Sequence, residues 1–189
     1  MVTQAFMTIP AHRARKTRDG LGDLIATNVG WLEQALSHLQ QMSDTTFSTS
    51  PMGLQPHRVG SHLRHALEFY ECFLDGLEAS FVDYDARKRD ELIMRSRHAA
   101  AEKIHSIIRR LELIASESDD VPLTIRAENA DYDLTSSLGR ELQALSSHTI
   151  HHFALMAVTL KLHGFEVSSE FGMSPSTLRH QAKTSPEAV

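Results

Sequence analysis

Four stretches of the chain repeat apolar residues every three or four positions, and this spacing constrains the fold more than any other feature. The stretches cover residues 21–42, 58–80, 91–116 and 138–162. Such spacing places the apolar side chains on one face of an α-helix, and each stretch spans several turns. A helix of this kind buries its apolar face against other helices. The sequence therefore predicts an all-α fold built from four long amphipathic helices.

The segments between these stretches carry residues that end helices. Residues 43–56 are rich in Ser, Thr, Pro and Gly, and residues 81–90 form a charged link that we expect to be irregular. In residues 121–137 apolar and polar residues alternate on both sides of a turn, which predicts a small two-stranded hairpin. Ser136 or Ser137 can then cap the last long helix. We expect a four-helix bundle with crossover connections and a small β-hairpin insert before the last long helix.

The length and composition favour one globular domain. We predict a single domain over residues 1–189, with flexible tails at about 1–17 and 173–189. An apolar content of 41% is ordinary for a soluble protein, and no apolar run approaches the roughly 18 residues of a membrane span. The one cysteine, Cys72, rules out an intramolecular disulfide and fits a reducing compartment. We therefore expect a cytoplasmic protein that does not enter a membrane.

Histidine is the outlier in the composition. A net charge of −5 argues against a nucleic-acid partner, and a small-molecule substrate fits a site built from histidines better. Histidine is the commonest metal ligand and the usual acid–base group near neutral pH. Of the twelve histidines, six fall in two clusters: His57, His62, His65, and His148, His151, His152.

The spacing of His148 and His152 points to a metal site. Four residues is just over one helical turn, so both imidazoles leave the same face with Cβ atoms about 6 Å apart. Two imidazoles at that separation can ligate one transition metal. Thr149 stands where the zinc-protease pattern H-E-x-x-H has its Glu base, which excludes that class. His65, in the middle of the second helix, can supply a third ligand, because bundles build metal sites from facing helices.

Four further side chains share helix faces with these ligands and are candidate catalytic groups. His62 and Glu68 lie three residues before and after His65, His151 lies three residues after His148, and Glu141 lies seven residues before it. A metal with an open coordination position makes bound water or thiolate a nucleophile near neutral pH. The four candidates are predicted to shuttle the proton.

Two segments resemble a known family. Residues 59–77, VGSHLRHALEFYECFLDGL, place Gly60 five residues before His65. Residues 136–158 carry the His148/His152 pair. These segments are similar to the second- and fourth-helix motifs of the DinB-like four-helix-bundle superfamily of metal-dependent enzymes. The resemblance implies that the metal ligands are His65, His148 and His152.

The resemblance covers nearly the whole chain, since residues 82–90 and 171–180 also look like one bacterial branch of that family. It implies homodimers and a divalent metal such as zinc, nickel or iron. It also implies a hydrolase or a transferase that acts with a low-molecular-weight thiol. Many members carry Arg-Gly-Gln after the second ligand histidine of this helix, whereas this chain has Phe153-Ala154-Leu155. The resemblance therefore does not extend to a particular substrate.

Two alternatives remain open at this point. In the first, the chain is a non-catalytic metal-binding or stress-response module that acts through a dimer surface. In the second, His65 points away from His148, and the histidine clusters bind no metal. The relative positions of these two rings decide the second alternative.

Overall fold

The protein is mostly helical. The computed structural model describes residues 17–117 and 119–184. Its long helices are α1 (Thr17–Gln41), α3 (Val59–Gly76), α5 (Arg97–Glu117) and α6 (Leu138–Leu162). The shorter ones are α2 (Asp44–Ser48), the 3-10 helix η1 (Tyr84–Ala86), α4 (Glu91–Arg95) and α7 (Pro175–Thr184). The four long helices confirm the predicted helical periodicity.

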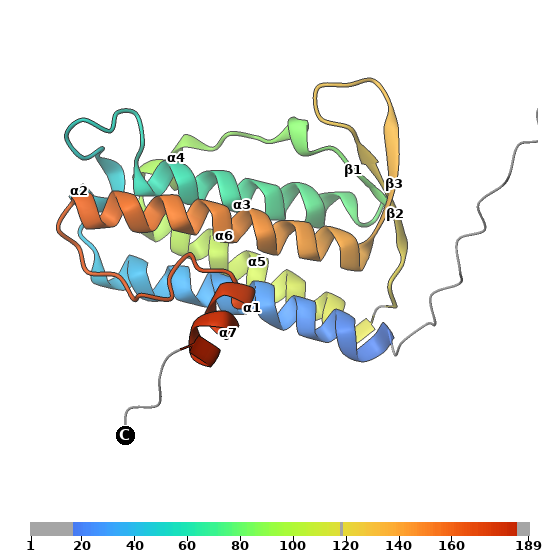
Figure 1. Ribbon diagram of the computed structural model, residues 1–189. Helices are drawn as coiled ribbons and strands as arrows, with labels where there is room; N and C mark the ends of the chain where they lie inside the picture. The colour runs from blue at the N-terminus through green and yellow to red at the C-terminus, as the bar shows by residue number, and fades with distance from the viewer. Residues whose placement is uncertain (1–16, 118, 185–189) are drawn as a thin grey trace, which may run out of the picture.

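The four long helices enclose one apolar core. Helix α3 packs against α5 and α6, and α1 packs against the same two helices (Figure 1). The order around the core is therefore α1, α5, α3, α6, so that α1 and α3, which follow each other among the long helices, lie diagonally. Each helix contributes a side chain that is at most 1% exposed: Leu32, Leu63, Ile104 and Phe153. Burial of these faces is the main stabilising contribution to the packing.

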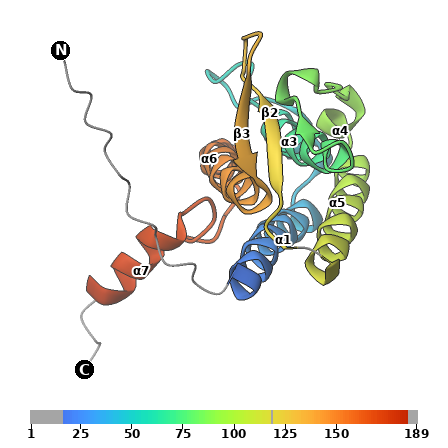
Figure 2. The same cartoon turned by 90° about the vertical axis from the view of Figure 1, so that its right-hand side faces the viewer.

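A small sheet lies where α3 ends and α6 begins (Figures 1 and 2). Its strands are β1 (Phe81–Val82), β2 (Pro122–Arg126) and β3 (Asp133–Ser137), in the order β1-β2-β3. The antiparallel pair β2–β3 confirms the hairpin. The prediction that residues 81–90 are irregular holds for residues 87–90 but was wrong for residues 81–82 and 84–86, because β1 pairs in parallel with β2 and η1 follows it. A two-residue strand has no periodicity of its own to detect.

Two predicted helix boundaries were also wrong. The stretch predicted as one helix over 91–116 is broken at Ser96, whose extended backbone ends α4 and whose hydroxyl accepts a hydrogen bond from the Ala99 amide. The second long helix ends at Gly76 and not at residue 80. A Cβ on Gly76 would lie 2.3 Å from the carbonyl oxygen of Phe81, so the close return of the chain to β1 requires glycine. The hydroxyl of Ser137 caps α6 as expected.

Gly60 allows α4 to pack closely on α3. A Cβ at this position would lie 2.2 Å from the carbonyl oxygen of Met94 and 2.9 Å from the Phe47 ring. Both distances are far inside van der Waals contact. The glycine that precedes His65 by five residues therefore has a structural role, because it seats the end of α4 beside the first turn of α3.

The chain ends are described only in part. The predicted N-terminal tail, residues 1–17, lies outside the described residues except for Thr17. The predicted C-terminal tail contains α7, which projects away from the long helices and buries none of its residues (Figure 2). Among the described helices, none combines the length and apolar character that a membrane crossing requires.

Candidate metal centre

Three histidines from two neighbouring helices converge on one point. His65 comes from the middle of α3, and His148 and His152 come from successive turns of α6. One ring nitrogen of each lies within 4.8 Å of those of the other two. The ring centroids are 5.0 Å apart for His65 and His148 and 4.6 Å apart for the other two pairs. The predicted triad can therefore hold a metal ion, and the alternative in which His65 points away is wrong.

An aromatic side chain forms one wall of the triad. The Phe69 ring lies 3.9 Å from the His148 ring, edge to face, and 4.9 Å from the His65 ring. Tyr84 of η1 stacks on Phe69 at 5.1 Å, and the Arg87 guanidinium lies over the same ring at 4.6 Å. Phe69 of α3 therefore covers one side of the triad, and the link after α3 adds the Tyr84 ring and the Arg87 cation against Phe69.

The triad imidazoles are held neutral by their surroundings. Burial, followed by the charge of Arg87, lowers the pKa of His65. Burial and neighbouring imidazoles lower the pKa of His148 from 6.5 to about 4 and that of His152 to about 3. The neutral imidazole is the form that ligates metals. The triad is therefore already in its metal-binding protonation state near neutral pH.

Two further histidines connect the triad to the surface. The Nδ1 atoms of His62 and His152 lie 3.4 Å apart, and Nε2 of His62 lies 3.3 Å from Nδ1 of His57. His62 is buried, with a pKa lowered to about 4 mainly by burial, whereas His57 is exposed. The contact through Nδ1 leaves Nε2 of His152 available to a metal. A second ring that fixes the orientation of a ligand histidine in this way is common at metal sites.

His151 stands at the rim of the centre. Its side chain is exposed, and its ring lies 5.1 Å from that of His152 in an edge-to-face arrangement. Its nitrogens do not belong to the group that can hold the ion. Its predicted role in proton transfer is compatible with this place, since it is in contact with both solvent and a ligand ring.

The carboxylate of Glu68 is held by the backbone and a neighbouring arginine. Its Oε1 accepts a hydrogen bond of 2.8 Å from the Asp90 amide and lies 3.6 Å from Nε of Arg64. Burial raises its pKa, against the opposing effect of Arg64. Within the described part of the chain, no hydrogen bond or ion pair joins this carboxylate to the triad. Its hydrogen bond fixes the end of the covering link to α3.

The carboxylate of Glu141 is held in a similar way. It accepts hydrogen bonds from the Tyr84 hydroxyl, at 2.7 Å, and from the Ser136 hydroxyl, at 2.5 Å. It is buried and lies two turns before His148 on α6. The bond to Tyr84 fixes the start of the covering link, as Glu68 fixes its end. Proton transfer by either carboxylate stays a prediction.

Thr149 faces the interior of the protein and not the triad. It is 1% exposed, and its hydroxyl lies 3.0 Å from the Tyr70 hydroxyl and 2.8 Å from the Leu145 carbonyl oxygen. Tyr70 in turn donates a hydrogen bond to the Asn28 side chain on α1. The side chain at position 149 therefore belongs to a polar network between α1, α3 and α6. This agrees with the exclusion of the zinc-protease pattern.

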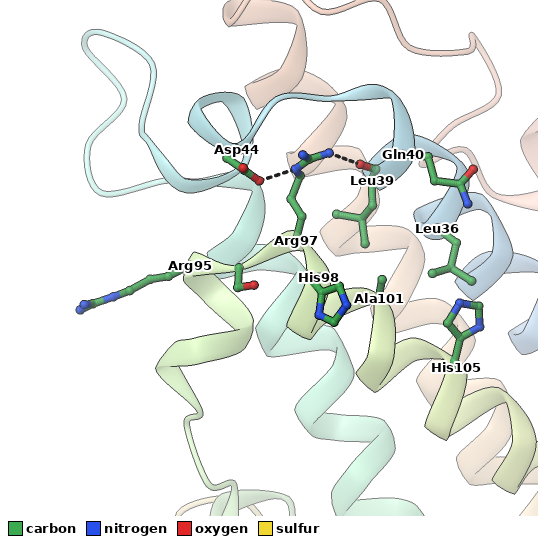
Figure 3. A pocket seen from close by; sticks show the side chains of 10 residues that line it. Leu36, Leu39, Gln40, Asp44, Arg95, Arg97, His98, Ala101 and His105 are labelled. Carbon is green, nitrogen blue, oxygen red and sulfur yellow. Dashed lines mark hydrogen bonds and ion pairs between the residues drawn. The ribbon is translucent and has the colours of Figure 1, made fainter.

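Two cavities are candidate substrate sites. The larger, of about 590 Å³, lies between α1 and α5 away from the triad, and its Arg97 is paired with Asp44 and the Leu39 carbonyl (Figure 3). The smaller, of about 240 Å³, is lined by His148 and Phe69. The smaller cavity is therefore the one that adjoins the candidate metal centre.

Sequence reasoning missed the residues that cover the triad. Phe69 follows His65 by one turn, and Tyr84 and Arg87 fall in the link that was predicted to be irregular. Only the i, i+4 spacing of His65 and Phe69 gave a local signal. The positions of Tyr84 and Arg87 depend on the sheet and on the anchoring glutamates, so no local pattern indicates them.

No known family model matches the chain. Over 108 residues, or 54% of its length, the chain is 39% identical to FK506-binding protein 5 of Rhizopus delemar. The chain spans 28% of the length of that relative. The similarity therefore covers only part of each protein, and it does not bear on the DinB-like resemblance.

Proposed function

We propose that the protein is a DinB-like four-helix bundle whose triad holds a divalent metal ion, namely zinc, nickel or iron, for a reaction on a small molecule. The convergence of three ligand nitrogens within 4.8 Å carries this proposal. Three protein ligands on a tetrahedral ion leave one position open, which is the usual arrangement of catalytic and not structural zinc sites. The reaction classes that fit are hydrolysis and transfer with a low-molecular-weight thiol.

The chemistry divides between the metal and the chain. A bound divalent ion lowers the pKa of a water or thiol at its open position. His65, His148 and His152 hold the ion, while His62 orients His152. His62 and His57 form a line of ring nitrogens along which a proton can pass between the centre and the solvent. His151 offers a second route at the rim, while the rings of Phe69 and Tyr84 keep water away from one side.

The hydrogen bonds made by the carboxylates of Glu68 and Glu141 favour a second function. Glu68 and Glu141 are both engaged by structural hydrogen bonds, so neither stands as a free base beside the triad. This favours a non-catalytic metal-binding or stress-response module that acts through a homodimer surface. The two functions differ in whether the fourth coordination position exchanges with solvent.

The first experiment measures metal content. The protein is purified without a His-tag or chelator and analysed for metals, together with His148→Ala and the control His98→Ala. His98 is exposed on α5, away from the triad, with its Nδ1 3.7 Å from the Glu102 carboxylate. We expect about one divalent ion per chain in the wild type and in the control, and a loss in His148→Ala. Equal metal content in all three proteins would overturn the assignment.

The second experiment separates the two functions. Cobalt replaces the native ion, and azide or a low-molecular-weight thiol is added while the visible absorption spectrum is recorded. A change in the spectrum supports an open catalytic position. An unchanged spectrum, together with a large fall in melting temperature when the metal is removed, supports the structural site of the second function.

A further inference from the structure

The cavity beside the triad has an apolar wall. It lies between the hairpin and the helices α3 and α6, and its apolar lining comes from Phe69, Tyr84, Ile125, Ala127, Leu134, Ala144 and Leu145. His148 completes the wall on the side of the triad. Its volume of about 240 Å³ lies below the roughly 300–1,000 Å³ of sites that enclose a whole ligand. The cavity therefore fits one short apolar part of a substrate.

The polar groups of Arg126 and Tyr84 on this wall already have partners, whereas the Glu128 side chain, which also lines the cavity, is exposed to solvent. The Arg126 guanidinium pairs with Asp133 at 2.6 Å, and the Tyr84 hydroxyl donates to Glu141 at 2.7 Å. A polar ligand group in the cavity would lose its bonds to water without gaining these donors. An alkyl or aryl group meets no such cost.

Arg87 supplies a positive charge next to the cavity, in contact with two residues that line it. Its guanidinium lies over Phe69, the ring that also contacts His148, and one nitrogen donates to the Tyr84 carbonyl. Among the described residues no carboxylate forms an ion pair with Arg87.

The charge of Arg87 reaches the triad. The Phe69 ring under the Arg87 guanidinium contacts both ligand rings, with centroid distances of 4.9 Å to His65 and 3.9 Å to His148. Three neutral imidazoles around a divalent ion add further positive charge at the same place. An anionic group would offset both charges.

We propose that the centre takes a small amphiphilic carboxylate, with its alkyl or aryl group in the cavity and its carboxylate beside Arg87. The planar guanidinium matches a carboxylate in shape and charge. This inference deepens the proposed function, on which it rests for the reaction. The cavity and Arg87 exist in the metal-free chain, so binding can be tested separately from metal content.

The test measures binding by calorimetry on the metal-free and the zinc-loaded protein. The probes are hexanoate, hexanamide, which has the same alkyl chain without charge, and acetate, which has the charge without the long chain. We expect hexanoate to bind roughly tenfold more tightly than either, as one charge-assisted contact or a few buried methylenes would give. Equal binding of hexanoate and hexanamide to both forms would overturn the proposal.

Variants test whether the carboxylate binds beside Arg87 and whether the alkyl group binds in the cavity. Arg87→Gln is expected to lose the preference for hexanoate over hexanamide, whereas the control Lys88→Gln, a neighbouring exposed cation paired with Asp75, keeps it. Ala144→Phe fills the cavity and is expected to remove the preference for hexanoate over acetate. Leu134→Gln, at a half-exposed position of the same wall, serves if Ala144→Phe does not fold. Wild-type preferences in Arg87→Gln overturn the proposal.

Metal analysis of the same samples distinguishes a failure of this inference from a failure of the proposed function. If the purified protein carries no metal but the metal-free form still prefers hexanoate, the inference stands and the proposed function fails. If the protein carries one ion per chain but neither form prefers hexanoate, the proposed function stands and the inference fails.

Discussion

The Nδ1 atoms of His62 and His152 lie 3.4 Å apart. His62, which is not one of the three candidate ligands, therefore fixes the orientation of the His152 ring, which is one. His62 is buried and also contacts His57, which limits its own rotation. A ligand histidine held in this way needs no reorientation when the ion binds. The contact would therefore contribute to metal affinity although the His62 nitrogens do not belong to the group that can hold the ion.

Removal of His62 is expected to weaken metal binding. In His62→Ala the His152 ring loses the contact at Nδ1, and such outer contacts are commonly worth about 10–100-fold in metal affinity. Competition for zinc against a coloured chelator measures the change. His98→Ala is the matched control, since His98 lies exposed on α5. An affinity equal to wild type in both variants would show that His62 does not position the ligand.

The metal-free protein is expected to lose stability in mild acid. The pKa is about 4 for His62 and His148 and about 3 for His152, against 6.5 in the unfolded chain. Between these values the unfolded state binds more protons, so stability is fully present above about pH 6.5 and falls as the pH drops towards 4. Allowing for solvent screening, protonation of each of these groups in the unfolded chain lowers the free energy of unfolding by about 1 kcal/mol.

Urea unfolding of the metal-free protein at several pH values measures this loss. His148→Gln removes one of the titrating groups, so the fall in stability below about pH 6.5 should be smaller in that variant. A stability that does not change between about pH 7 and 4.5 would contradict the lowered pKa values. Saturating zinc should make the acid loss steeper, because protons then compete with the metal for the same nitrogens.

Loss of the Tyr84 hydroxyl is expected to destabilise the link over the triad. In Tyr84→Phe the buried Glu141 carboxylate keeps only its bond from Ser136, and a lost bond to a buried charge costs about 1–3 kcal/mol. Thermal unfolding measures the effect. Tyr132→Phe is the control, because Tyr132 is 61% exposed and should be near wild type. Equal losses in the two variants would contradict an anchoring role for the Tyr84–Glu141 bond.

A methyl group at position 60 is expected to force α3 and α4 apart. Gly60→Ala places Cβ 2.2 Å from the Met94 carbonyl oxygen, and overpacking of this kind typically costs about 1–3 kcal/mol. Gly30→Ala is the matched control, since a Cβ there meets nothing within 4 Å and alanine favours the helix by about 0.5–1 kcal/mol. Urea unfolding of both variants is expected to give opposite signs. A stabilised Gly60→Ala would contradict the close contact.

The ligand triad could be predicted because its signals are local. The four-residue spacing of His148 and His152 fixes their shared face once the helix forms, and His65 lies at the middle of another amphipathic stretch. The helical periodicity also gave the four long helices. What it could not give was the break at Ser96, where one capping hydroxyl ends a helix inside a continuous periodic pattern.

The surroundings of the triad could not be predicted, because they depend on contacts between distant segments. Glu68 and Glu141 share helix faces with ligands, as the spacing suggested, but their hydrogen-bond partners come from the link and the hairpin. Arg87 gains its place over Phe69 only after β1 pairs with β2. No property of the link alone distinguishes Arg87 from Lys88 or Arg89.

The triad draws its three imidazoles from α3 and from α6, and metal binding there would couple metal supply to folding. An unfolded chain brings His148 and His152 near each other only by chance and leaves His65 far away, so the ion binds the folded chain in preference. At a free concentration about 100 times the dissociation constant, such an ion adds about 2.7 kcal/mol of stability. That is a large share of the few kcal/mol by which domains of this size are stable. The amount of folded protein in a cell would therefore follow the availability of the ion.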